Sequence, residues 1–180
     1  MVRRDLLKGL LGALGLALGR RAAAADEAPR VERFELPKSE WKKRLPPEAY
    51  AVLFEEDTER PGSSPLDREK RAGTYVCAAC MLPLFESKAK FDSGTGWPSF
   101  FRPIEGHLGT RTDVKLFLPR TEYHCARCGG HQGHVFDDGP PPTGLRYCIN
   151  SVSLDFTPQG EPLPDELGRG SPEGEPWPRR

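Results

Sequence analysis

Cysteine is the residue type whose spacing says most about the chemistry of this chain. Four of its five cysteines form two C-x-x-C pairs, at residues 77–80 and 125–128. Two such pairs supply four thiolates, enough to complete a tetrahedral zinc site with no open position. The alternatives are two redox dithiols or two disulfides. We favour one structural zinc ion, and its expected ligands are Cys77, Cys80, Cys125 and Cys128.

The fifth cysteine, Cys148, has no cysteine left to pair with and is therefore a candidate nucleophile. If the segment around it is one extended strand, residues two apart share a face, so Arg146, Cys148 and Asn150 lie side by side. A nearby Arg146 would favour the thiolate, and Asn150 could orient a polar group that reacts at the sulfur. The alternative is a buried structural cysteine in a β core, and the local sequence does not separate the two.

Two histidines and a tryptophan are the other residues suited to chemistry. His131 and His134 directly follow the second cysteine pair, so a bound metal would fix their position. Histidine is the natural proton donor near neutral pH, although both could instead be metal ligands or surface residues. Trp97 lies in a Gly-x-Gly-Trp-Pro sequence, where its indole offers an apolar wall for a methyl or thioether group, unless it is a core residue. We interpret His107 and His124 as structural.

These side chains must be positioned by a loop-rich fold. Glycine and proline number 19 each among 180 residues, which favours short strands joined by turns over a helical bundle. The hydrophobic pattern predicts strands at 74–76, 114–118 and 147–156. Residues 39–50 predict two short helices separated by Pro46-Pro47, and the polar stretch 57–72 predicts a loop with one short helix. The sequence therefore predicts one mainly β domain.

The charge of the chain argues against a polyanionic partner. The whole chain has 26 basic and 26 acidic residues. Removal of residues 1–25 takes away five basic residues and one acidic residue, which leaves 21 against 25 and a net charge of −4. Such a weakly acidic domain has no electrostatic footprint for nucleic acid or for an anionic membrane.

The N-terminus has the pattern of an export signal. Arg3-Arg4 and two leucines precede an uncharged run of 11 residues, and an Ala-rich stretch ends at residue 25. The pattern resembles a bacterial twin-arginine signal, and its apolar run is shorter than the roughly 20 residues of a permanent membrane anchor. We expect a signal peptide at 1–25, a linker at 26–38, one domain at 39–157 and a disordered Pro/Gly-rich tail at 158–180. The expected location is the bacterial periplasm.

Four separated motifs resemble the B class of methionine sulfoxide reductases, enzymes that act on the R epimer of methionine sulfoxide. They are GTYVCAAC at 73–80, SGTGWPSF at 93–100, CGGHQGHVF at 128–136 and GLRYCINS at 144–151. The likeness extends over residues 39–157. It implies a mainly β fold in which two antiparallel sheets pack together, with short N-terminal helices and a zinc site made of four cysteines.

The resemblance also implies a role for each candidate residue. Cys148 is the expected nucleophile that reduces methionine R-sulfoxide in proteins or peptides and is left as a sulfenic acid. His131, His134 and Asn150 are expected around the sulfoxide oxygen, whose protonation they assist. Trp97 is expected to receive the substrate methyl group, and Phe136 is a further expected substrate-binding residue.

One position departs from the family pattern. Many members carry a recycling cysteine where this chain has Thr95, and the other four cysteines are assigned to zinc. Recycling of Cys148 is therefore expected to need an external reductant, either a small thiol or a thioredoxin-like protein, and the alternative is the sacrifice of a zinc cysteine. Two other functions stay open at this point: a non-catalytic, zinc-stapled β binding module, similar to small guanine-nucleotide-exchange proteins, and a general thiol peroxidase.

Overall fold

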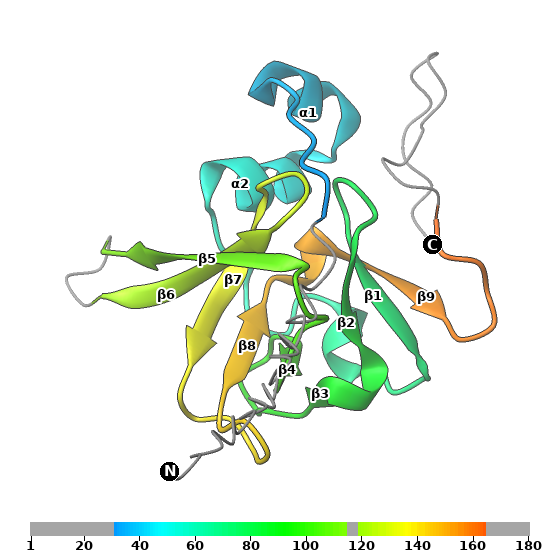
Figure 1. Cartoon of the computed structure of the whole chain (residues 1–180), viewed down its shortest axis with the longest axis vertical. Coiled ribbons are helices and arrows are strands. Elements are labelled where there is room, and N and C mark those ends of the chain that lie inside the picture. The colour runs from blue at the N-terminus through cyan, green and yellow to red at the C-terminus, as the bar shows by residue number, and fades with distance from the viewer. Residues whose placement is uncertain (1–30, 115–118, 165–180) are drawn as a thin grey trace, which may run out of the picture.

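The computed structural model describes residues 31–114 and 119–164 of the chain (Figure 1). The expected signal peptide, the linker up to residue 30, positions 115–118 and residues 165–180 of the expected tail lie outside the described ranges. Within those ranges, no helix combines the length and the apolar character needed to cross a membrane.

The described residues form two antiparallel sheets preceded by two helices, α1 (Lys38–Arg44) and α2 (Pro47–Glu55). The three-stranded sheet has the order β2-β1-β9 and consists of β1 (Gly73–Cys77), β2 (Pro83–Glu86) and β9 (Leu154–Pro158). The six-stranded sheet has the order β3-β4-β8-β7-β6-β5. Its strands are β3 (Lys90–Phe91), β4 (Ser99–Phe100), β5 (Leu108–Asp113), β6 (Arg120–Cys125), β7 (His131–Phe136) and β8 (Arg146–Ile149). Three short 3-10 helices complete the fold: η1 (Pro65–Arg68), η2 (Ser87–Ala89) and η3 (Ser151–Ser153).

Two short helices form where they were predicted, but α2 includes Pro47 and extends to Glu55, beyond the predicted end at residue 50. Pro46 precedes α2 as its N-cap residue and Pro47 opens it, a position where a missing N–H costs nothing. The helices pack through Trp41 of α1 and Phe54 of α2, whose rings stack with centroids 5.2 Å apart. The predicted short helix within 57–72 is also present, as η1.

Aromatic side chains from both sheets meet in the core between them. Phe85 of β2 stacks on Phe100 of β4 at a centroid distance of 4.3 Å, and Tyr75 of β1 meets the same ring edge-on at 4.9 Å. Burial of each ring contributes about 1.5–3 kcal/mol. Tyr123 of β6, which is fully buried, donates its hydroxyl to the backbone oxygen of Cys148 at 3.1 Å. The core therefore holds the backbone of the candidate nucleophile directly.

The predicted strand at 147–156 was wrong as a single element. β8 ends at Ile149, η3 follows, and β9 belongs to the other sheet. The strand breaks because its two halves have different partners: Cys148 pairs with residues of β4 and β7, whereas Phe156 pairs with Tyr75 of β1. Asn150 thus lies at the crossover between the sheets, and the strand face expected to carry Arg146, Cys148 and Asn150 ends before Asn150.

The predicted strand at 114–118 is not supported at its one described position. Val114 lies just beyond the end of β5 and is exposed, and the remaining four positions fall outside the described residues. The strands on either side of this segment are β5 and β6, which pair from Leu108 opposite Cys125 to Asp113 opposite Arg120. At the other end of the domain, β9 extends to Pro158.

Candidate active site and metal centre

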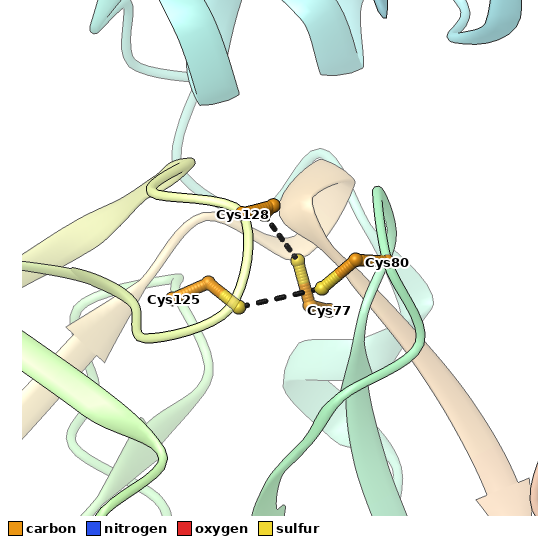
Figure 2. A group of neighbouring side chains, drawn as sticks. All are labelled: Cys77, Cys80, Cys125 and Cys128. Carbon is orange, nitrogen blue, oxygen red and sulfur yellow. Dashed lines mark hydrogen bonds between the residues drawn. The ribbon is translucent and has the colours of Figure 1, made fainter. Parts of the chain in front are cut away.

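The two cysteine pairs come together in one cluster (Figure 2). Each pair sits in a tight turn of the same construction. Met81 and Gly129 both adopt a positive φ and donate their N–H to the carbonyl oxygen of the first cysteine of their pair, at 2.9 Å in each case. Glycine adopts this conformation without steric cost, which explains the residue at position 129. The two turns face each other and bring four sulfur atoms together.

The cluster fits a zinc ion. The four sulfurs lie within 4.8 Å of one another, with 3.7 Å between Cys77 and Cys128 and 3.5 Å between Cys80 and Cys125. A tetrahedral Zn–S₄ site with bonds of about 2.3 Å requires sulfurs about 3.8 Å apart. All four cysteines are free thiols, so the structure does not contain the alternative pair of disulfides. Hydrogen bonds with the neighbouring sulfurs raise the pKa of Cys128, so four thiolates coexist here only when a cation compensates their charge.

The register of the six-stranded sheet places two of the predicted catalytic residues, Cys148 and His134, in one row. Cys148 lies opposite His134 on β7 and opposite Ser99 on β4. His134 in turn lies opposite Glu122 on β6, and Glu122 lies opposite Arg111 on β5. Directly opposed residues of neighbouring strands point to the same face of a sheet. The thiol and a histidine are therefore neighbours on one face, as required for the expected chemistry.

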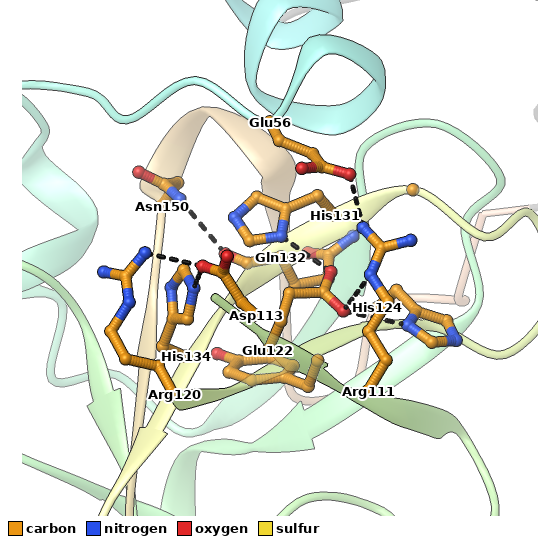
Figure 3. Close-up of polar contacts among 12 residues, drawn as sticks. Glu56, Arg111, Asp113, Arg120, Glu122, His124, His131, Gln132, His134 and Asn150 are labelled. Atoms are coloured by element: carbon orange, nitrogen blue, oxygen red, sulfur yellow. Dashed lines mark hydrogen bonds and ion pairs between the residues drawn. The ribbon is translucent and has the colours of Figure 1, made fainter. Parts of the chain in front are cut away.

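His131 forms a buried pair with a carboxylate (Figure 3). Its Nδ1 lies 2.7 Å from Oε1 of Glu122, and both side chains are 3% exposed. With the Nδ1 proton on this bond, Nε2 is the nitrogen left for a reacting group. Burial raises the pKa of Glu122, but hydrogen bonds from His124 and His131 outweigh it and hold the pKa at about 2.

His134 makes a matching pair with a different carboxylate. Its Nε2 lies 2.8 Å from Asp113 at the end of β5, and Arg120 binds the same carboxylate at 2.6 Å. Burial lowers the pKa of His134, and the hydrogen bond to Asp113 opposes this effect. The two imidazole centroids are 5.4 Å apart (Figure 3). Both rings line a cavity of about 260 Å³ bounded by β5, β6 and β7, so the two histidines are brought together as predicted.

Cys148 is half-buried, and this burial raises the pKa of its thiol above the usual range. The guanidinium of Arg146 and the hydroxyl of Thr95 act in the opposite direction by stabilising the thiolate. Arg146 is held by a two-pronged ion pair with Asp138, at 2.8 and 2.9 Å, and lies 4.3 Å from the ring centroid of Phe136. The predicted influence of Arg146 on the thiol therefore has the expected sign, although burial is larger. Phe136 packs on this arginine.

Asn150 has a fixed side-chain orientation. Its Oδ1 accepts from the backbone N–H of Glu59 at 3.1 Å, and its Nδ2 donates to the backbone oxygen of Gln132 at 3.3 Å. Nδ2 carries two hydrogens, and the second can donate to a substrate oxygen. Trp97 is half-buried, and its indole N–H donates to the backbone oxygen of Glu59 at 3.3 Å.

Sequence reasoning missed the groups that hold the site together: Glu122, Asp113, Glu59 and Gln132. The sequence offered one indication for Glu122, because an acidic residue in a strand that also contains buried residues needs a partner for its charge. The other three gave none, because they contact groups from distant parts of the chain: Asp113 and His134 are 21 residues apart, Gln132 and Cys77 are 55 apart, and Glu59 and Val152 are 93 apart. Gln132 also donates to the sulfur of Cys77 at 3.3 Å, which links the metal centre to β7. His124 also contacts Glu122, with its Nδ1 at 3.2 Å from Oε2 of the carboxylate.

Comparison with known proteins agrees with this geometry. The model of the SelR domain family matches residues 45–158. The chain is 54% identical over 130 residues to the peptide methionine sulfoxide reductase MsrB of Pseudomonas putida strain W619, a match covering 72% of this chain and 98% of that protein. It is 57% identical over 121 residues to the MsrB of Bradyrhizobium diazoefficiens, covering 67% of this chain and 87% of that protein. Against peptide methionine sulfoxide reductase B1, chloroplastic, of Arabidopsis thaliana, identity is 50% over 130 residues, covering 72% of this chain and 64% of that protein.

Proposed function

The chain belongs to the methionine-R-sulfoxide reductase B family, and we propose that it reduces methionine R-sulfoxide in peptides and proteins through Cys148. The observation that carries this proposal is the position of Cys148 opposite His134, in the same row of the sheet as the carboxylate that orients His131. It is also the one cysteine outside the metal cluster. A non-catalytic binding module has no use for this combination of thiol and histidine–carboxylate pairs.

The reductive step transfers one oxygen to Cys148. The thiolate attacks the electrophilic sulfur of the sulfoxide, and a proton is delivered to the sulfoxide oxygen. Methionine departs with its sulfur reduced to a thioether, while the oxygen and the proton end on Cys148 as a sulfenic acid. His131 and His134 are the groups placed to supply the proton, and the second Nδ2 hydrogen of Asn150 can bind the same oxygen.

Trp97 supplies the site for the substrate methyl group in this proposal. Its indole N–H is already bonded to Glu59, so the ring presents its apolar face rather than a polar edge. Phe136 is a less direct contributor because its ring packs on Arg146.

A zinc ion would be held by Cys77, Cys80, Cys125 and Cys128, whose geometry fits it. With four thiolates it has no open position, so its contribution is to folding rather than to the reaction. It would fix the turn that precedes β7, and Gln132, bonded to Cys77, extends this support to Asn150.

Recycling of the sulfenic acid requires two external thiols in this proposal. The first condenses with Cys148 to a mixed disulfide and releases water, and the second reduces that disulfide back to the thiol. Thr95, whose hydroxyl stabilises the Cys148 thiolate, stands where many family members carry the recycling cysteine. A small thiol or a thioredoxin-like protein is therefore the proposed reductant.

The proposed compartment follows from the N-terminal sequence. The twin-arginine pattern and the Ala-rich stretch before Asp26 support export to the periplasm of a bacterium. This route carries folded proteins, so the four zinc thiolates would already hold their metal when they reach an oxidising compartment. Replacement of Arg3-Arg4 by Lys-Lys should leave uncleaved precursor in the cytoplasm, and unchanged processing would rule out this route.

The reaction is tested by single-turnover reduction of a blocked methionine sulfoxide peptide, with each sulfoxide epimer supplied separately. Wild-type protein should reduce the R epimer only. Cys148→Ser should be inactive and yet retain zinc and its folded spectrum. Equal reduction of both epimers, or activity that survives in Cys148→Ser, would contradict the proposal.

A further inference from the structure

We propose that Glu59 is a positioning residue that sets Trp97 and Asn150, two residues of the proposed substrate site, in their places. The inference rests on the proposed function, because it assigns Glu59 a part in the binding and reduction of the sulfoxide. Glu59 belongs to the segment 57–64, which joins α2 to η1 without helical or strand structure of its own.

Glu59 bonds to both residues through its own peptide groups. Its N–H donates to Oδ1 of Asn150 at 3.1 Å, and its carbonyl oxygen accepts from the indole of Trp97 at 3.3 Å. The methyl-binding wall and the amide that faces the sulfoxide oxygen are thus attached to the same residue. A displacement of this backbone would move both groups together.

The side chain of Glu59 is what anchors this backbone. Its two carboxylate oxygens accept the backbone N–H groups of Ser151 and Val152, the latter at 3.2 Å. Ser151 opens η3, at the crossover between the two sheets. A carboxylate at such N–H groups makes charge-assisted hydrogen bonds, the stronger kind. The anchor point and Asn150 are adjacent in sequence, so Glu59 ties its own segment to the end of the strand that carries Cys148.

A second contact keeps the segment against the Trp97 loop. The N–H of Gly62 donates to the carbonyl oxygen of Gly96 at 2.7 Å. Gly96 has a φ of +85°, and a Cβ there would come within 2.8 Å of the Gly62 nitrogen and 2.9 Å of Pro61. The glycine that precedes Trp97 is therefore required for this close approach. The segment 57–64 is thus bonded both to the Trp97 loop and to Asn150, and Glu59 is its point of attachment.

The test uses the full-length protein with its zinc and compares Glu59→Ala and Glu59→Gln with a matched surface variant, Glu105→Ala. A displacement of about 1 Å at a reacting centre slows a reaction by roughly 10²-fold. The quantity measured is the single-turnover rate constant divided by the R-sulfoxide concentration that gives half the maximal rate. We expect Glu59→Ala to lower this ratio by about 10²-fold. Glu59→Gln keeps one acceptor oxygen and should lose less. Glu105→Ala should stay within about twofold of wild type, since Glu105 is exposed and outside the site.

A double-mutant cycle with Trp97→Phe separates positioning from general destabilisation. Phenylalanine has no indole N–H for Glu59 to hold, so Glu59→Ala should weaken substrate binding far less in that background than in wild type. Effects that simply multiply in the double variant would overturn the proposed route through Trp97. Glu59→Ala kinetics equal to those of Glu105→Ala would overturn the proposal as a whole.

A measurement without substrate keeps this inference distinct from the proposed reaction. In a nitrogen–proton correlation spectrum, the Trp97 indole signal is identified by its loss in Trp97→Phe. The Trp97 indole signal and the Asn150 side-chain amide signals should both shift in Glu59→Ala. In Glu105→Ala they should stay unchanged. Unmoved signals would refute the positioning role whether or not the protein is active. A wild-type protein inactive on both epimers would refute the proposed function, even if the signals shift.

Discussion

Glu122→Gln tests the buried pair that orients His131. The side chain is 3% exposed, and its pKa is lowered from 4.5 to about 2. At about 1.36 kcal/mol per pKa unit, this corresponds to roughly 3 kcal/mol of folding stability carried by the ionised carboxylate. Because the folded pKa is the lower one, this stability is present above pH 4.5 and is lost as the pH falls toward 2. Glutamine has nearly the same shape but no charge, so at pH 7 the variant should be less stable by about this amount.

The assay is urea unfolding of wild type and Glu122→Gln between pH 7 and pH 3, with Glu105→Gln as a matched control. Both proteins have the same zinc ligands, so proton competition for the metal cancels in the difference between them. The difference should be about 3 kcal/mol at neutral pH and should shrink below the ordinary pKa of a glutamate. A gap below about 0.5 kcal/mol, the size expected for an ordinary surface substitution, would refute this reasoning. So would a gap that does not change with pH. The same variant should slow the reductive step by about 10²-fold or more, because His131 loses the partner that fixes its tautomer.

Three further predictions concern the metal, the thiol and recycling. Cys77→Ser should lose zinc and cooperative unfolding together, whereas Cys148→Ser should retain both; elemental analysis and circular dichroism measure this, and a folded, zinc-free Cys77→Ser would contradict it. Arg146→Met removes a charge that stabilises the thiolate, so the pH at which Cys148 becomes half-alkylated should rise; a fall would reverse the proposed sign. Thr95→Cys should convert the oxidised wild-type species into an intramolecular disulfide with Cys148, detected by mass spectrometry; a persistent sulfenic acid would show that the two side chains do not meet.

Much of the site could be predicted from the sequence because its key residues are local in the chain. The two C-x-x-C pairs supply four cysteines as metal ligands, and Cys148 is the one cysteine left once those four are assigned. His131 and His134 follow the second pair within six residues. Residues three apart in a regular strand point to opposite faces, and both rings reach the same cavity where the register of β6 and β7 shifts between them. The proline pair likewise divided the N-terminal helices without any tertiary information.

The remainder depended on pairings between distant segments. Residues 147–156 read as one strand, because alternation alone cannot show that Cys148 pairs with β7 while Phe156 pairs with β1. The orienting carboxylates were missed for the same reason: Glu122 meets His131 only through the register of β6 and β7, and Asp113 of β5 meets His134 of β7 across the intervening strand β6. Glu59 bonds to Trp97 and Asn150 through its peptide groups, and its carboxylate accepts backbone N–H groups 92 and 93 residues away, so no residue-type argument identifies it.

The central claim is that the oxygen removed from methionine sulfoxide ends on the sulfur of Cys148. The most direct measurement is mass spectrometry of the Cys148 peptide after one turnover, without reductant, in the presence of a sulfenic-acid label. With the R epimer, we expect one labelled Cys148 for each methionine formed, no disulfide and full retention of zinc; with the S epimer, we expect no label. Methionine formed with Cys148 unmodified, or with Cys148 joined to a zinc cysteine and the metal released, would contradict the account.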